Sequence, residues 1–120
     1  MNWQVGSTSG KFKKTSDFRL PTKTFVLLDE HPDSINDGYY SVGYHPDSPA
    51  WVDVPASYHN GAAGFSFADG HSEVHKWRSR TTQIPPIPYA LVYPFNVPRS
   101  EGIDYFWTIE HMYALDEPIR

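Results

Sequence analysis

Three histidines lie within 17 residues of this sequence, in the segment SYHNGAAGFSFADGHSEVHKW (57–77). Imidazole side chains bind metal ions and transfer protons near neutral pH, so this segment is the first place to look for chemistry. It also contains Asp69-Gly70 between two runs of strand-forming residues, a strong signal for a two-residue hairpin turn. The sequence therefore predicts a β-hairpin over residues 64–77, and any site there must be compatible with strand geometry.

Strand geometry argues against a metal site on this segment alone. In a regular two-residue hairpin Phe65 pairs with Val74 and shares the core-facing side with Phe67. The opposite side is then expected to be polar apart from one indole, and to carry His71, Glu73, His75 and Trp77. Residues four positions apart on an extended strand are ~13 Å apart, which is too far for His71 and His75 to bind one metal ion.

His59 stands apart because it precedes the hairpin by a glycine-rich loop. If residues 60–64 double back, His59 meets Asp69, and a hydrogen bond between them fixes the loop onto the turn. A catalytic pair would also need a nucleophile, and the nearby serines lack a recognised motif: Ser57, Ser66 and Ser72. We interpret His59, Asp69 and Gly70 as structural, with a metal ligand as the next alternative for His59.

A second polar cluster follows the first predicted strand. The stretch DEHPDSINDG (29–38) places five oxygen-bearing side chains in nine residues, namely Asp29, Glu30, Asp33, Asn36 and Asp37. Calcium accepts six to eight oxygen ligands in flexible geometry, so these residues are candidate calcium ligands. The spacing is not that of an EF-hand, and an acidic turn whose side chains satisfy one another is the alternative.

Aromatic side chains offer a third kind of site. Trp51, Tyr58 and Trp77 would form a sugar-binding surface if they were exposed, because aromatic faces stack on sugars. Burial in the core is the alternative, and we favour it, since the eight Tyr, seven Phe and four Trp must supply much of the core.

Composition narrows the classes of protein. The chain has 120 residues, a net charge of −4 and no cysteine, which excludes disulfides, thiolate zinc sites and thiol catalysis. The basic residues form only two short clusters, so nucleic acid is not an expected partner. No apolar run approaches the ~18 residues that a membrane span needs, and no secretion signal opens the chain.

The expected elements belong to one α+β domain over residues 1–120, mainly antiparallel β. After an irregular lead-in (1–20), strands are expected at 22–28 and 39–44, followed by the hairpin. A short C-terminal helix is expected over 104–113, with Asp104 as its N-cap.

The spacing from His59 to Asp69-Gly70 is H-X9-DG, and this sequence resembles the prepilin-type processing-associated H-X9-DG proteins. The segments PTKTFVLLDEHPDSINDGYY, PASYHNGAAGFSFADGHSEVHKW and DYFWTIEHMY all take part in the resemblance, which covers about residues 20–113. Such proteins are related to pilins and to the major pseudopilin of type II secretion. They carry a leader and an apolar N-terminal helix that anchors the subunit in the membrane, and neither is present in this chain.

The resemblance implies a pilin-like globular headpiece without its N-terminal helix, located in the periplasm or outside the cell. Its work would be contact with other pilin-like subunits or secretion components, without catalysis. Major pseudopilins bind calcium in a C-terminal loop, but those ligands cannot be carried over to residues here. The alternative from another class is a secreted module that binds a glycan or calcium. A metal enzyme comes third, because HSEVH (71–75) has two histidines four apart but lies on a predicted strand and carries its glutamate at the third position, so it is not an HExxH motif.

Overall fold

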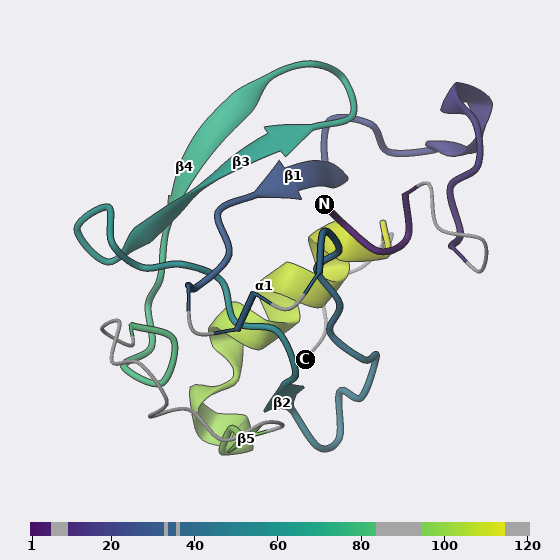
Figure 1. Cartoon of the computed structure of the whole chain (residues 1–120). Helices are drawn as coiled ribbons and strands as arrows, with labels where there is room; N and C mark the ends of the chain where they lie inside the picture. The colour runs from purple at the N-terminus through teal and green to yellow at the C-terminus, as the bar shows by residue number, and fades with distance from the viewer. Residues whose placement is uncertain (6–9, 33, 36, 84–94, 115–120) are drawn as a thin grey trace.

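The computed structural model describes residues 1–5, 10–32, 34–35, 37–83 and 95–114, and these form an α+β fold. A three-stranded antiparallel sheet with the order β1-β3-β4 lies along one side of the helix α1 (Figure 1). The strands are β1 (Phe25–Leu28), β3 (Ala62–Phe67) and β4 (Ser72–Lys76), and the helix spans Ile103–Met112. The expected α+β class, the first strand, the hairpin and the C-terminal helix are therefore confirmed.

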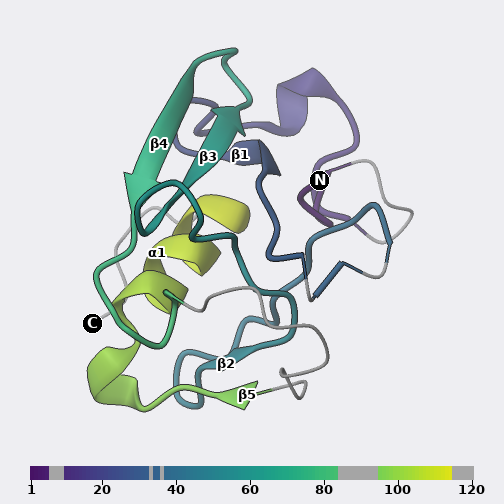
Figure 2. The same ribbon diagram turned by 60° about the vertical axis from the view of Figure 1, so that its left-hand side comes forward.

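A second, two-stranded sheet lies beyond the first turn of α1 (Figure 2). It pairs β2 (Ala50–Trp51) with β5 (Phe95–Asn96) in antiparallel fashion. Two short 3-10 helices complete the described elements, η1 (Thr15–Asp17) and η2 (Arg99–Glu101), and η2 leads directly into α1. No helix in the described residues combines the length and the apolar character that crossing a bilayer requires.

Aromatic side chains dominate the core between the sheet and α1, as the composition predicts. The largest fully buried side chains include Trp51, Trp77, Tyr40, Tyr105 and Phe25. Phe65 lies at the centre of this cluster and contacts the rings of Phe25, Trp77 and Trp107 edge-on, with centroid distances of 5.1–5.8 Å. Edge-to-face contacts of this kind add stability beyond the area that the rings bury.

The register of the hairpin differs from the prediction by one residue. Phe65 pairs with Glu73 and Gly64 with Val74, so Val74 points away from the core and is 69% exposed. The cause is the turn, because Gly70 alone takes a left-handed conformation (φ 95°) and its N–H bonds the carbonyl of Phe67. This is a three-residue loop closed by a glycine bulge, not the expected two-residue turn.

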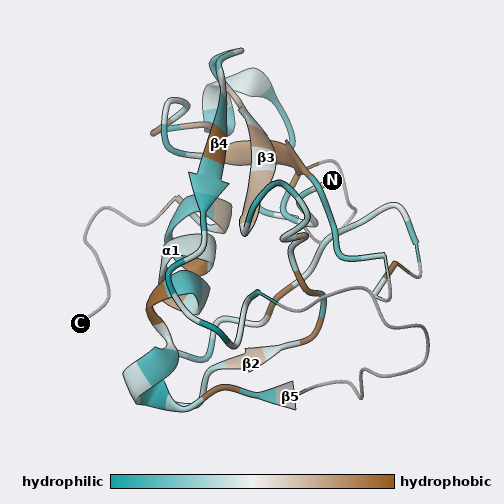
Figure 3. Cartoon of the chain, turned by 90° about the vertical axis from the view of Figure 1, so that its left-hand side faces the viewer, coloured by the Kyte–Doolittle hydropathy of each residue, from teal (hydrophilic) through white to brown (hydrophobic). Residues whose placement is uncertain are grey.

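The shift exchanges the two faces of the strand. A one-residue slip moves every side chain of a strand to the other side of its sheet. The face that carries His71, His75 and Trp77 is therefore the core face, and it meets the same helix as Phe65. Figure 3 shows β3 mostly in hydrophobic colours and β4 mostly in hydrophilic ones, so β4 contributes polar residues to this contact.

Three further expectations were wrong in part. Residues 39–44 do not form a strand: Tyr40 makes only an isolated parallel bridge with Asn2. The lead-in is irregular apart from η1 and isolated bridges, but it is anchored to the core, because Asn2 is fully buried. Its side-chain amide donates to the carbonyls of Phe25 (2.9 Å) and Met112 (3.1 Å). The helix begins at Ile103 after Gly102, so Asp104 is not its N-cap.

Candidate functional site

His59 and Asp69 lie at opposite ends of β3, and each has another partner. His59 Nε2 lies 3.2 Å from Oδ2 of Asp29, which also accepts a hydrogen bond from the N–H of Gly64 (3.0 Å). His59 therefore ties the loop before β3 to the end of β1, the neighbouring strand. The predicted hydrogen bond between His59 and Asp69 is wrong, because a six-residue strand separates the two side chains.

Asp69 belongs to a local network at the hairpin turn. Its carboxylate accepts hydrogen bonds from the main-chain N–H (3.1 Å) and from Nδ1 of His71. The Nε2 atom of the same imidazole lies 3.1 Å from Glu73. Hydrogen bonds to Asp69 and then to Glu73 raise the pKa of His71, while His71 lowers the pKa of Asp69. Both ring nitrogens of His71 are occupied, so this carboxylate–imidazole network stabilises the turn.

The nine residues between His59 and Asp69 correspond to one strand with a turn at each end. Before β3, Asn60 and Gly61 both have positive φ (56° and 77°), and the N–H of Gly61 bonds the carbonyl of Ser57. After β3, the three-residue loop ends at Gly70. The spacing H-X9-DG is therefore the length of β3 plus its two turns.

The acidic stretch 29–38 is divided between two parts of the molecule. The Asp29 side chain contacts the start of β3, whereas Glu30 accepts a hydrogen bond from the Ser34 hydroxyl (2.9 Å). Asp37 caps its own turn by accepting from the N–H of Tyr39 (2.8 Å). Asp33 and Asn36 lie outside the described residues. Within the described ranges, no three carboxylate or imidazole groups lie together as a metal site would require.

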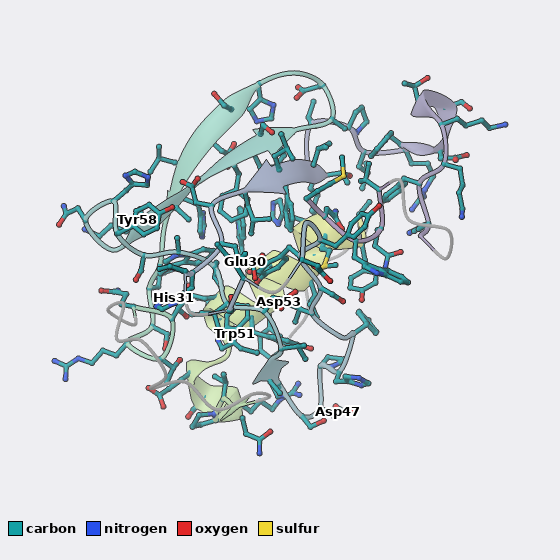
Figure 4. All side chains as sticks on the ribbon, in the orientation of Figure 1. Glu30, His31, Asp47, Trp51, Asp53 and Tyr58 are labelled. Atoms are coloured by element: carbon teal, nitrogen blue, oxygen red, sulfur yellow. The ribbon has the colours of Figure 1, made fainter. Side chains whose placement is uncertain are left out.

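Glu30 instead faces a carboxylate that the sequence did not bring to attention. Asp53 is 6% exposed, and its Oδ2 accepts a hydrogen bond from the N–H of Ser41 (2.7 Å). Both acids lie in the middle of the molecule (Figure 4). The pKa of Glu30 is raised to about 7, mainly by burial. The hydrogen bond from Ser34 lowers this pKa, and the charge of Asp53 raises it. Burial also raises the pKa of Asp53.

A third polar group interacts electrostatically with this acid pair. The Tyr40 side chain is fully buried, and its hydroxyl has no hydrogen-bond partner among the described residues. Burial and the charges of Asp53 and Glu30 raise the pKa of Tyr40 well above its ordinary value. The arrangement retains a proton at Glu30 near neutral pH, and Glu30 does not line the groove described below.

The raised pKa of Glu30 contributes stability that is lost as pH rises from about 4.5 to about 7. A carboxyl group whose pKa is higher in the folded state holds its proton more tightly there, so ionisation favours unfolding. As pH rises from the ordinary pKa of 4.5 to the folded-state pKa of about 7, the stabilisation that comes from the tighter binding of the Glu30 proton is lost. We expect the contribution of Glu30 to the free energy of unfolding to fall by about 1–2 kcal/mol, a value reduced for solvent screening because Glu30 is only half-buried.

Denaturant unfolding at pH 5 and pH 8 measures this loss as the difference between the wild type and Glu30→Gln, because the lowered pKa values of His75 and His111 change stability in the opposite direction in both proteins. Glu30→Gln is expected to remove most of it, leaving the smaller contribution of Asp53. Glu101→Gln is the matched control, because it makes the same substitution at an exposed residue of η2 that is not part of the acid pair. Equal pH dependence in the wild type and Glu30→Gln would contradict the prediction.

The favoured expectation, burial in the core, is confirmed for Trp51 and Trp77, and the alternative of a sugar-binding surface is wrong for these two residues. Trp51 and Trp77 are 0% and 1% exposed, so they belong to the core and cannot stack on a sugar. Tyr58 is 53% exposed, but its ring packs edge-on against His59 at 4.8 Å. A single exposed tyrosine does not form a sugar-binding platform.

Two histidines pack as aromatic rings, and one of them, His75, was wrongly expected on the polar side of the hairpin. The ring of Trp107 stacks on His75 at 3.7 Å and on His111 at 4.1 Å. Burial lowers the pKa of His75, and it lowers that of His111 to about 4, so both imidazoles are neutral at neutral pH. Trp107 and His111 are one helical turn apart, a spacing that indicates contact on a helix.

A groove of about 410 Å³ lies between the end of β4 and the first half of α1. Ile103, Phe106 and Trp107 supply its apolar wall, and Arg78 and Arg99 lie at its rim together with Glu110. Asp104 lies beneath it and is 1% exposed. Its carboxylate accepts the main-chain N–H groups of Arg78 (3.0 Å) and Ser79 (2.8 Å), which fixes the chain after β4 against the helix.

The class that the fold and these contacts define is a small α+β domain whose conspicuous polar residues support its architecture. Comparison with known proteins adds no family to this description. The chain matches no family model, no curated protein and no solved structure.

Proposed function

We propose that this chain is the globular headpiece of a pilin-like structural subunit, which acts by contact with other subunits and without catalysis. Its place would be the periplasm or the cell surface. The observation that carries the proposal is the role of the H-X9-DG residues. His59, Asp69 and Gly70 set the beginning and end of β3, so the resemblance rests on a conformational motif.

The local chemistry agrees with a role in assembly. Both nitrogens of His71 are hydrogen-bonded to carboxylates, and neither the half-buried Glu30 nor the buried Asp53 lines the groove beside α1. The exposed apolar side chains include Leu27 (51%) and Val74 (69%), both on the side of the sheet that faces away from α1. Exposed apolar residues on an uncovered sheet face are typical of surfaces that contact another protein.

The DNA upstream of the Met1 codon provides the first test. We expect an in-frame leader that ends in glycine, followed by about 20 apolar residues, the length that spans a bilayer. With that sequence restored, the protein should enter the membrane fraction of its native cell and form cross-linked ladders. An in-frame stop codon directly before Met1 would refute the proposal.

A further inference from the structure

The three-stranded sheet has two edge strands, and they differ in how they are protected. Figure 1 shows β3 between β1 and β4, as the strand order requires. β1 has four residues, an irregular register between Phe25 and Leu27, and a carbonyl at Val26 that already accepts the N–H of Asn2 (2.8 Å). Short, irregular or covered edge strands resist pairing with another chain. β4 keeps a regular register along its five residues, so it is the edge on which another strand can pair.

The ladder between β3 and β4 determines which main-chain groups face outward. At one end of β4 the carbonyl of His71 accepts a hydrogen bond from β3, and at the other end the N–H of Trp77 donates one to the residue before β3 (both 2.9 Å). In an antiparallel ladder every second residue bonds the neighbouring strand, and the residues between them direct their N–H and C=O groups the other way. The outward residues are therefore Ser72, Val74 and Lys76, and all three are exposed. Among the residues that the structure describes, their main-chain groups have no hydrogen-bond partner.

We propose that β4 pairs with β4 of a second copy, antiparallel and about a two-fold axis at Val74. The two sheets then continue into one another, and Ser72 lies opposite Lys76 of the second copy. Each outward residue exchanges N–H···O=C bonds with its counterpart, which gives about six main-chain hydrogen bonds. The inference goes beyond the proposed function, because the contact needs only this domain and not an N-terminal helix.

The side chains of β4 select this partner and this register. Glu73 faces His75 of the second copy, and no two like charges stand directly opposite each other. A slip of two residues in one direction places Glu73 opposite Glu73, which is destabilising, and a slip in the other direction leaves Ser72 beyond the paired strand. Val74, which is 69% exposed in the single copy, packs against its own counterpart. The contact uses the same surface on both copies, so it closes as a dimer.

A single introduced thiol tests the register directly, because the chain has no cysteine. Val74→Cys places two thiols in an opposite pair with Cα atoms about 5.5 Å apart, which is within reach of a disulfide. Leu27→Cys is the matched control, since Leu27 is 51% exposed on the same side of the sheet but lies on β1. Under mild oxidation we expect Val74→Cys to form disulfide-linked dimers at least about tenfold faster than the control, because its thiols are already adjacent.

A proline at the centre of β4 tests the main-chain contact. Val74→Pro removes an outward N–H and leaves the ladder to β3 intact, and such edge positions tolerate proline. Sedimentation velocity should show at least about tenfold weaker association than for the wild type.

Two variants at position 72 form a matched pair of opposite charge. In the dimer this position faces Lys76 of the second copy, and the pairing occurs twice. Ser72→Glu should therefore associate about threefold more tightly than the wild type, and Ser72→Lys about threefold more weakly. Thermal unfolding verifies that all variants are folded, and the pair at position 72 keeps the test valid if Val74→Pro does not fold.

Three outcomes would overturn the inference. The first is a wild type that stays monomeric at about 1 mM. The second is cross-linking of Val74→Cys no faster than that of Leu27→Cys. The third is a shift of association in the same direction for Ser72→Glu and Ser72→Lys. The sequence upstream of Met1 bears on none of these measurements, so the dimer and the proposed function stand or fall separately.

Discussion

Replacing Trp77 by phenylalanine is expected to lower the free energy of unfolding by about 3 kcal/mol, the sum of a lost buried ring and a lost hydrogen bond. The indole is 1% exposed, and its Nε1–H donates to the carbonyl of Ala56 at 2.7 Å. Phenylalanine leaves a cavity beside Phe65 and leaves that carbonyl buried without a donor. Chemical denaturation of the purified protein measures the change.

Trp51→Phe is the matched comparison, because Trp51 is equally buried but its Nε1 has no hydrogen-bond partner in the described part of the chain. In Trp51→Phe only the loss of buried ring volume lowers the free energy of unfolding. Removal of an unpaired buried N–H offsets part of this loss, so we expect the free energy of unfolding to fall by about 1 kcal/mol. Equal losses for the two variants would show that the bond from Trp77 to Ala56 contributes nothing.

Asp104→Ala is expected to cost about 2–4 kcal/mol, since the main-chain N–H groups of Arg78 and Ser79 both lose their acceptor. These N–H groups hold the segment after β4 against α1, so the loss should also loosen the groove. Hydrogen exchange at Arg78 and Ser79 provides the local measurement, because unprotected amides exchange through local opening.

Asp104→Asn separates the charge from the shape of this acceptor. An amide oxygen still accepts one of the two N–H groups, so we expect roughly half of the loss seen with alanine. If Asp104→Ala unfolds reversibly with wild-type stability and wild-type exchange at Arg78, the proposed role of Asp104 is incorrect.

Elements built on local signals could be predicted from the sequence. β1 follows from an apolar, β-branched run, α1 from a continuous helical segment, and the hairpin from Asp69-Gly70 between two strand-forming runs. The register could not be predicted, because Asp-Gly fits both a two-residue turn and the last two positions of a three-residue loop. Only the inclusion of Ala68 in the loop distinguishes them, and that choice depends on which face of β4 meets the helix.

The contacts of the candidate site depend on pairings between distant parts of the chain. His59 meets Asp29 only because β1 pairs with β3, and Glu30 meets Asp53 only because the segment around Val54 runs beside it. Tyr40 bridges to Asn2 instead of joining a strand with its own neighbours. The predicted calcium site grouped Asp29 with Glu30 because they are adjacent in the sequence. Consecutive residues of an extended chain, however, point to opposite sides.

The buried Asn2 determines how the domain responds to a pull on its ends. Its single side-chain amide is bonded to β1 and to the last turn of α1, across 110 positions of the sequence. Tension applied between the first residues and the end of the helix would load these two hydrogen bonds before it reached the sheet or the aromatic core. The first residues and the end of the helix would therefore separate before the hairpin and the groove are disrupted.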